Sequence, residues 1–465
     1  MMRRTRGTEG RGRWSVRVAV MLVAAAVAAG VDSRAAAAQE RDSIPGVTLG
    51  LVYETSYRPA LALKPFTGRF GGGGLAPRVE AIIGRDLRNA DRFEVLDSLP
   101  AHLVGEAVDY ALWDRLGAVW LLTGQVEGAG SDYVLLLELH DVVYGQVKEK
   151  GRFRIPDPAD EDFRMAVHRA SDAIVRWATG DPGMAASRIA FSMVTGEGAK
   201  ELYVIDADGE NLRRLTRDRS IILSPAWSTD GTRIAFSRMT DDAQWRIFEL
   251  DLATGEERPL PVLREGSYIT PAYHPDGKRL AFAILGGGRS GVYTYDVADG
   301  CCLANVTGGR WNDQSPTFSP DGQRMAFNSN RFGIAVPQIM VMPTAGGEAE
   351  TLSPFRSGSG GFYTAPDWSP RGDFVAFHGR IRRGEYQILV ADPKDLGHRV
   401  RQLTWEGNNE DPTWAPDGRH LAFVGERRWG FGLMVVDVSS GKIRTLVSSR
   451  RVSVPDWSPT LTPGG

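Results

Sequence analysis

The chain has 465 residues, of which 24% are charged, and a formal net charge of −2 at pH 7. This length allows two or three domains. The near-neutral balance lacks the basic surplus of nucleic-acid-binding proteins, so we expect no nucleic-acid partner.

Residues 1–38 have the composition of an export signal. Seven arginines lie in this stretch, six of them before the apolar run from Val18 to Val31, and small residues follow from Ala35 to Ala38. The pattern predicts cleavage after Ala38, because small residues mark such cleavage sites. The apolar run is too short to span a bilayer comfortably, so a retained anchor is the less favoured alternative. The mature chain is expected outside the cytoplasm, not membrane-spanning, with a net charge of about −7.

Residues 39–180 are predicted to form a separate α/β domain. Apolar periodicity indicates strands at 60–63, 93–96, 118–126, 133–139 and 143–153, and helices at 77–88, 110–116 and 161–178. The glycine run from Gly71 to Gly74 is not followed by Gly-Lys-[Ser/Thr], which excludes a phosphate-binding loop. We therefore expect a flexible connection there.

A motif of proline, any residue and an aromatic residue recurs six times in the second half of the chain. The prolines are 46, 45, 50, 46 and 43 residues apart, and this period fits the four short strands of one β-propeller blade. The aromatic residue is predicted to pack between blades rather than to stack on a ligand. The six copies are Ser224-Pro225-Ala226-Trp227, Thr270-Pro271-Ala272-Tyr273, Ser315-Pro316-Thr317-Phe318, Ala365-Pro366-Asp367-Trp368, Asp411-Pro412-Thr413-Trp414 and Val454-Pro455-Asp456-Trp457.

The two ends of this region complete each other. The strand that begins at Arg188 has no motif before it, whereas the last motif, ending in Trp457, has no Ala-Phe strand after it. We therefore predict that the last motif joins the first blade and closes a six-bladed ring over residues 187–460, which leaves no sheet edge unpaired. The predicted fold is thus a small N-terminal α/β domain followed by an all-β, six-bladed propeller.

The cysteines Cys301 and Cys302 are adjacent, so no disulfide can join distant segments. Two free thiols are favoured over a vicinal disulfide, because a bond between neighbouring cysteines is strained.

No catalytic constellation is visible in the sequence. The seven histidines show no His-x-x-x-His or His-Glu-x-x-His spacing, and the stretch Arg356-Ser357-Gly358 lacks the Gly-x-Ser-x-Gly elbow. We expect no enzyme activity, catalytic residue, cofactor or metal. Residues just before each repeated proline should ring one mouth of the central channel, where the acidic ones would create negative potential; the alternative is that they only cap turns. The candidate partner-binding residues are Ser224, Thr270, Asp313, Ser315, Glu410 and Asp411.

Three stretches carry a resemblance to a known family: Arg58 to Phe66, Ile82 to Asn89, and Glu201 to Gly209 with the Arg-Leu-Thr that ends at Thr216. With the propeller repeats, they make essentially the whole mature chain resemble the TolB family of the Tol-Pal system. The resemblance implies a periplasmic, monomeric, non-enzymatic protein that maintains outer-membrane integrity during cell division.

The same resemblance implies two partners. The propeller would bind a Pal-like peptidoglycan-associated lipoprotein, and the N-terminal segment would contact a TolA-like inner-membrane protein. Residues Gln39 to Gly50, where that contact would lie, show no matching motif. An alternative from another class is a propeller hydrolase or lyase that acts on peptide or polysaccharide, which requires acid, base or metal groups converging in the channel.

Overall fold

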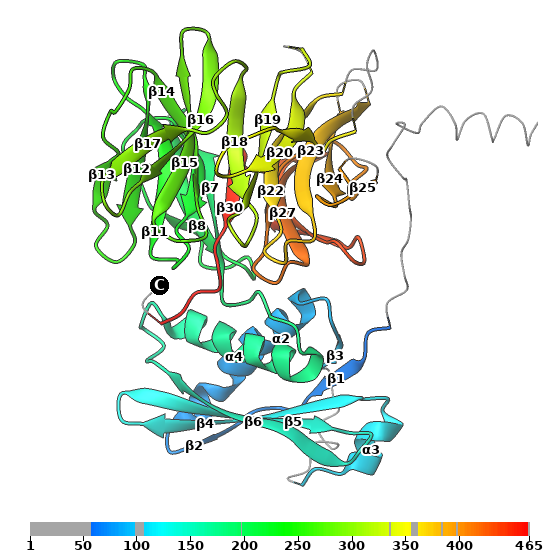
Figure 1. Cartoon of the computed structure of the whole chain (residues 1–465). Helices are drawn as coiled ribbons and strands as arrows, with labels where there is room; N and C mark the ends of the chain where they lie inside the picture. The colour runs from blue at the N-terminus through cyan, green and yellow to red at the C-terminus, as the bar shows by residue number, and fades with distance from the viewer. Residues whose placement is uncertain are drawn as a thin grey trace, which may run out of the picture.

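The computed structural model describes residues 57–97, 107–196, 198–333, 336–354, 361–382, 385–396 and 399–463. The predicted export signal and the segment from Gln39 to Gly50 lie outside the described residues. Figure 1 shows a propeller stacked on a smaller part, in which helices α2 and α4 lie between the sheet and the propeller. Among the described residues, no helix is both long and apolar enough to cross a membrane.

The N-terminal domain is a sheet covered on one face by two helices. Its strands follow the order β3-β1-β4-β5-β6, with β2 paired to β4, and the predicted elements are confirmed to within a few residues. Val79, Ile83 and Leu87 keep helical spacing on α2 and are fully buried in the core between helices and sheet. The elements are β1 (Ala60–Leu63), β2 (Thr67–Arg69), η1 (Gly72–Gly74), α2 (Ala76–Asn89), β3 (Glu94–Leu96), α3 (Tyr110–Arg115), β4 (Trp120–Ala129), β5 (Asp132–Asp141), β6 (Gln146–Ile155) and α4 (Phe163–Thr179).

The glycine run is an ordered turn, so the predicted flexible connection is wrong. Gly72–Gly74 forms a 3-10 turn that packs against β4. A Cβ atom on Gly72 would lie 2.2 Å from the carbonyl oxygen of Val126. A glycine is therefore required here by the close approach of two backbones.

The described part of the second half forms six four-stranded antiparallel sheets around one axis, as predicted. Each sheet is given from its inner to its outer strand. Blade 1 is β10 (Ile222–Trp227), β11 (Arg233–Met239), β12 (Trp245–Asp251) and β13 (Glu257–Pro259); blade 2 is β14 (Ser267–Tyr273), β15 (Arg279–Gly286), β16 (Arg289–Asp296) and β17 (Cys301–Asn305); blade 3 is β18 (Asp313–Phe318), β19 (Arg324–Ser329), β20 (Gln338–Pro343) and β21 (Glu350–Thr351). Blade 4 is β22 (Tyr363–Trp368), β23 (Val375–Arg382), β24 (Glu385–Ala391) and β25 (Val400–Gln402); blade 5 is β26 (Asn409–Trp414), β27 (His420–Arg427), β28 (Gly430–Asp437) and β29 (Ile443–Val447); blade 6 is β30 (Val452–Trp457), β7 (Arg188–Val194), β8 (Lys200–Asp206) and β9 (Arg213–Arg214).

The predicted closure of the ring is confirmed. The C-terminal strand β30 pairs antiparallel with β7, so that Trp457 lies opposite Ile189. The indole Nε1 of Trp457 donates to Ser187 Oγ at 2.8 Å, and Leu461 is fully buried beyond the strand. The sixth blade is therefore built from both ends of the propeller sequence.

The propeller has two distinct faces. The proximal face holds the turns that follow the inner strands and the turns between third and outer strands; it lies against the N-terminal domain (Figure 1), where Arg371 Nη2 is 3.3 Å from Asp181 Oδ1 and Lys442 Nζ is 2.7 Å from Asp91 Oδ1. The distal face holds the loops that lead into the inner strands and the turns between second and third strands. Because each blade repeats the same topology, all six contribute to both faces.

The prediction of two free thiols is wrong, because the neighbouring cysteines form a vicinal disulfide. Cys301 and Cys302 are joined at the start of the outer strand β17, with φ +67° at Cys302.

Candidate functional site in the propeller channel

Six irregularities at the same place in each inner strand form a ring within the channel. The residue before each repeated proline has φ between +49° and +54°, a region that non-glycine residues adopt only rarely. The pairing register shifts at each of these positions, as between Leu223 and Ala226 in blade 1. Proline has no N–H to give to the ladder, so the strand bulges and its side chains are redirected. The ring residues are Ser224, Thr270, Ser315, Ala365, Asp411 and Val454.

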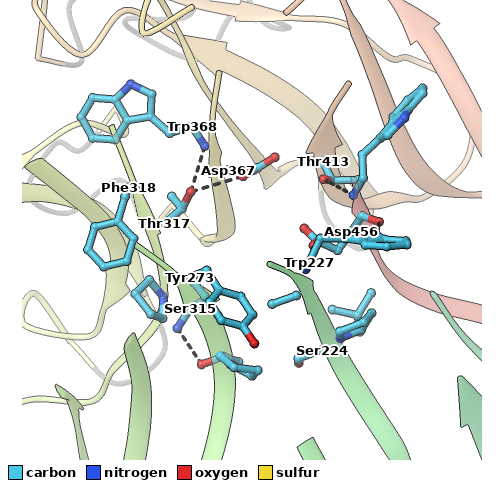
Figure 2. Close-up of a pocket in the computed structure, with 18 of the residues that line it drawn as sticks. Ser224, Trp227, Tyr273, Ser315, Thr317, Phe318, Asp367, Trp368, Thr413 and Asp456 are labelled. Carbon is cyan, nitrogen blue, oxygen red and sulfur yellow. Dashed lines mark hydrogen bonds between the residues drawn. The ribbon is translucent and has the colours of Figure 1, made fainter. Parts of the chain in front are cut away.

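The channel beside this ring is a cavity of about 490 Å³. Figure 2 shows the labelled lining residues, which come from all six inner strands. Hydroxyls, carboxylates, prolines and aromatic rings share its surface, and no histidine is among the described residues that line it.

Hydrogen bonds between neighbouring blades hold the lining rigid. Asp456 Oδ2 accepts the backbone N–H of Trp227 at 2.7 Å, and Asp367 Oδ2 accepts that of Trp414 at 2.7 Å. Burial raises the pKa of Asp367 to about 6 and, with the charge of Asp367, the pKa of Asp456 to about 8. In two other blades a threonine hydroxyl accepts the backbone N–H of the next blade instead, as Thr317 Oγ1 accepts that of Trp368. Because these carboxylates are bound to backbone amides, they are poorly placed to act as an acid and base pair.

The aromatic residues after the repeated prolines pack between blades, as predicted. Their exposed fractions lie between 4% and 8%. Trp414 illustrates the role, because its indole Nε1 donates to the carbonyl of Asp367 in the preceding blade at 3.1 Å. The six residues are Trp227, Tyr273, Phe318, Trp368, Trp414 and Trp457.

Four of the predicted partner-binding residues, Ser224, Thr270, Ser315 and Asp411, line the channel. Two of them use side-chain oxygens to hold the next bulge: Thr270 Oγ1 accepts from the Ser315 N–H at 3.1 Å, and Asp411 Oδ2 accepts from the Val454 N–H at 3.3 Å. Their structural role is therefore evident, whereas their role in partner binding stays a prediction.

The other two predicted residues do not lie where we expected. Asp313 is fully buried and faces Arg331, whose Nη2 is 3.5 Å from its Oδ1. Glu410 is half-buried and is not among the residues that line the channel. Burial raises the pKa of Asp313, of Glu410 and of Asp411. The three acidic residues therefore do not form one negative patch at the channel mouth: Asp411 lines the channel, whereas Asp313 and Glu410 do not.

A group of aromatic side chains on the distal face was missed in the sequence. They are between 38% and 48% exposed, and three directly follow an arginine in a loop, in the pairs with Arg310, Arg331 and Arg428. The neighbouring Arg380 lies 5.0 Å from the ring centre of Phe362 on the same face. Aromatic residues that lie in loops, outside the repeated strand pattern, are the sequence signal that could have indicated this group. We call Trp311, Phe332, Trp405, Trp429 and Phe431 the distal aromatic set.

The described residues bring one group of histidine and acidic side chains close together at the junction of the domains: Asp86, His168 and Asp208. Arg164 pairs with Asp208, and Asp86 Oδ2 is 2.8 Å from His168 Nδ1. Because Asp208 is paired with Arg164 and Asp86 with His168, we interpret the three as a network of polar contacts and assign no metal there.

Comparison with known proteins places both parts of the chain in one family. A family model described as the TolB beta propeller domain matches residues 176–461, and one described as the TolB amino-terminal domain matches residues 52–147. A Tol-Pal system protein TolB from Gluconobacter oxydans (strain 621H) is 30% identical over 399 residues, which cover 83% of this chain and 84% of that relative. A protein TolB homolog from Chlorobium chlorochromatii (strain CaD3) is 33% identical over 224 residues, covering 48% of this chain and 49% of that relative.

The crystal structure of TolB from Acinetobacter baumannii has the same fold. It superposes with a TM-score of 0.74 at 24% sequence identity, covering 87% of this chain and 97% of that one. The propeller model spans more than half of this chain, and the Gluconobacter relative aligns with more than four-fifths of it. The chain therefore belongs to the TolB family.

Proposed function

We propose that this protein is a non-enzymatic, periplasmic component of a Tol-Pal system, and that it binds a Pal-like peptidoglycan-associated lipoprotein through the distal face of the propeller. Its role would be to maintain outer-membrane integrity during cell division. Membership of the family and the names of its relatives support a role in a Tol-Pal system. The distal aromatic set supports binding through the distal face.

The single observation that carries the choice of face is the uneven distribution of exposed apolar side chains between the two faces. Nine large hydrophobic residues are exposed on the described part of the propeller, and seven of them lie in distal loops or at the distal end of a strand. These seven are the distal aromatic set with Val262 and Leu263. Tryptophan and arginine dominate the binding energy of protein interfaces, because they bury a large area and bind carboxylates or carbonyls at the same time. The paired strands of the ring anchor the loops that carry these side chains, which lowers the ordering cost of binding.

A contact to a TolA-like protein through the N-terminal segment is the second part of this proposal, and it concerns residues outside the described part of the chain. We expect the protein to act as a monomer. The alternative, a hydrolase or lyase working in the channel, is less well supported because the lining carboxylates are bound to backbone amides and no described lining residue is a histidine.

We predict that Trp405→Ala and Trp429→Ala each weaken binding of the lipid-free domain of the Pal-like lipoprotein by about 2 kcal/mol, roughly 30-fold in Kd, as interface hot spots do. Calorimetric titration of the mature protein measures this. Phe70→Ala is the matched control, since Phe70 is 79% exposed but lies on the N-terminal domain. Unchanged affinity in both tryptophan variants would contradict the chosen face, and no binding by the wild type would contradict the proposed function.

A further inference from the structure

Two buried histidines lie at the junction of the N-terminal domain and the propeller, and each faces a carboxylate of the other domain. His168 belongs to α4 of the N-terminal domain, whereas His420 begins β27 of the propeller. Both side chains are fully buried, and in both the Nε2 atom has no hydrogen-bond partner in the described part of the chain. A buried polar atom without a partner is costly, so these two require an explanation.

His168 has one partner in its own domain and one across the junction. Its Nδ1 is 2.8 Å from Asp86 Oδ2 on α2, and its Nε2 is 3.9 Å from Asp206 Oδ2 of the propeller. Burial opposes the charged form, but the charges of Asp86, Asp208 and Asp206 outweigh it and raise the pKa of His168.

His420 repeats this arrangement in the opposite direction. Its Nδ1 is 2.6 Å from Asp417 Oδ2 in the adjoining turn, and its Nε2 is 3.4 Å from Asp91 Oδ2 of the N-terminal domain. Burial again opposes the charge, and Asp417 with Asp91 raises the pKa of His420. For Asp91, burial is outweighed by His420 and Lys442, so its pKa is lowered to about 2.

The remaining charges around both histidines are already paired. On the His168 side, Arg164 binds Asp206 and Asp208, while Arg188 binds Asp206 and Arg85 binds Asp208.

On the His420 side, Arg58, Lys442 and Arg444 surround Asp91, and Arg419 binds Asp437. Asp86 and Asp417 each face one of the two histidines, whereas Asp206, Asp208, Asp91 and Asp437 are also paired with lysine or arginine. A hydrogen on the imidazole Nε2 would complete the contact to Asp206 at one site and to Asp91 at the other.

We propose that protonation of His168 and His420 latches the N-terminal domain to the propeller, so that the two domains dock more tightly as the pH falls and loosen as it rises. A histidine whose pKa is higher in the docked state than in the free state contributes stabilisation that is complete below its ordinary pKa. That stabilisation is lost as the pH rises through the raised value. Asp91 stays ionised far below this range, so the latch retains its acceptor.

One further group at the junction titrates in the same direction. Asp172 on α4 accepts the backbone N–H groups of Ala185 and Ala186, in the segment that connects the domains, at 2.8 and 2.9 Å. Burial raises the pKa of Asp172 to about 7. The contribution of Asp172 to the pH dependence of docking has to be separated from that of the histidines. Histidine variants that keep Asp172 separate the two contributions.

Hydrogen–deuterium exchange of the full mature protein tests the latch. After correction for the intrinsic exchange rate, we expect protection of the junction segments around residues 86–92, 164–172 and 417–420 to fall by on the order of tenfold between about pH 6 and about pH 9. Segments in the outer strands of blades 2 and 3 should change little. The double variant His168→Gln with His420→Gln should lose most of this pH dependence, whereas His274→Gln, a buried histidine within the propeller, should keep it.

Two outcomes would overturn the proposal: protection in the wild type that does not depend on pH, or the same pH dependence in the double variant. If the double variant does not fold, the pH dependence of protection in the two single variants and in the wild type still tests the proposal. A third outcome would also overturn the proposal: loss of wild-type protection when a chelator is added at constant pH. That result would mean that a metal ion, and not a proton, holds the two domains together.

Discussion

Removing residues 452–465 is expected to lower the free energy of unfolding by more than about 5 kcal/mol, because the deletion takes away the inner strand of the sixth blade. Replacing one buried Trp by Ala costs about 3 to 5 kcal/mol, and replacing one buried Leu costs about 2 to 5 kcal/mol. Here Trp457 and Leu461, which are 5% and 0% exposed, are lost together with the ladder to β7. The deletion also leaves the inner edge of β7 unpaired, which favours aggregation.

Chemical denaturation of the mature and truncated proteins measures this difference. If the truncated protein is insoluble, Trp457→Ala replaces it and should cost about 3 to 5 kcal/mol. A truncated protein with an unchanged melting temperature would mean that β30 contributes nothing to ring closure.

The second large effect is expected for Trp414→Ala, at about 3 to 5 kcal/mol of unfolding free energy. The indole fills the space between blades 4 and 5 and donates its N–H to Asp367. The substitution leaves a cavity and a carbonyl without its donor. Trp405→Ala is the control, because Trp405 is 48% exposed and the change should stay within about 0.5 kcal/mol. Equal stabilities for the two variants would show that Trp414 is not a core residue.

The architecture could be predicted because it repeats. Six copies of one motif fix the number of blades, and the incomplete copies at Arg188 and Trp457 fix the way the ring closes. In the N-terminal domain the apolar spacing of α2 and α4 reflects a real buried face, so the elements were found within a few residues.

The site could be predicted only in part. The residue before each proline was correctly placed in the channel, but the bulge that redirects its neighbours depends on backbone conformation, which composition does not reveal. For that reason Asp313, two residues before the bulge at Ser315, was expected at the channel mouth and instead is buried beside Arg331. Packing between distant backbones, as at Gly72, is likewise invisible in a single sequence.

The disulfide and the distal aromatic set could not be predicted from the sequence, for related reasons. The bond between Cys301 and Cys302 occurs together with a left-handed φ at Cys302, a backbone conformation that the sequence does not reveal. Trp405 and Trp429 carry no strand pattern, and whether a loop side chain lies on the surface depends on the loop's path. A repeated pattern identifies the residues that a fold needs, whereas the loop residues that we propose for recognition stand outside that pattern.

The most direct test of the proposed binding face is hydroxyl-radical footprinting of the mature protein, alone and with the lipid-free domain of the Pal-like lipoprotein at saturating concentration. We expect Trp311, Trp405 and Trp429 to become protected from oxidation, because they lie on the distal face. Tyr144, which is 77% exposed on the N-terminal domain, should stay reactive. Protection of Tyr144 with no change at the three tryptophans would contradict the account and move the binding site to the N-terminal domain.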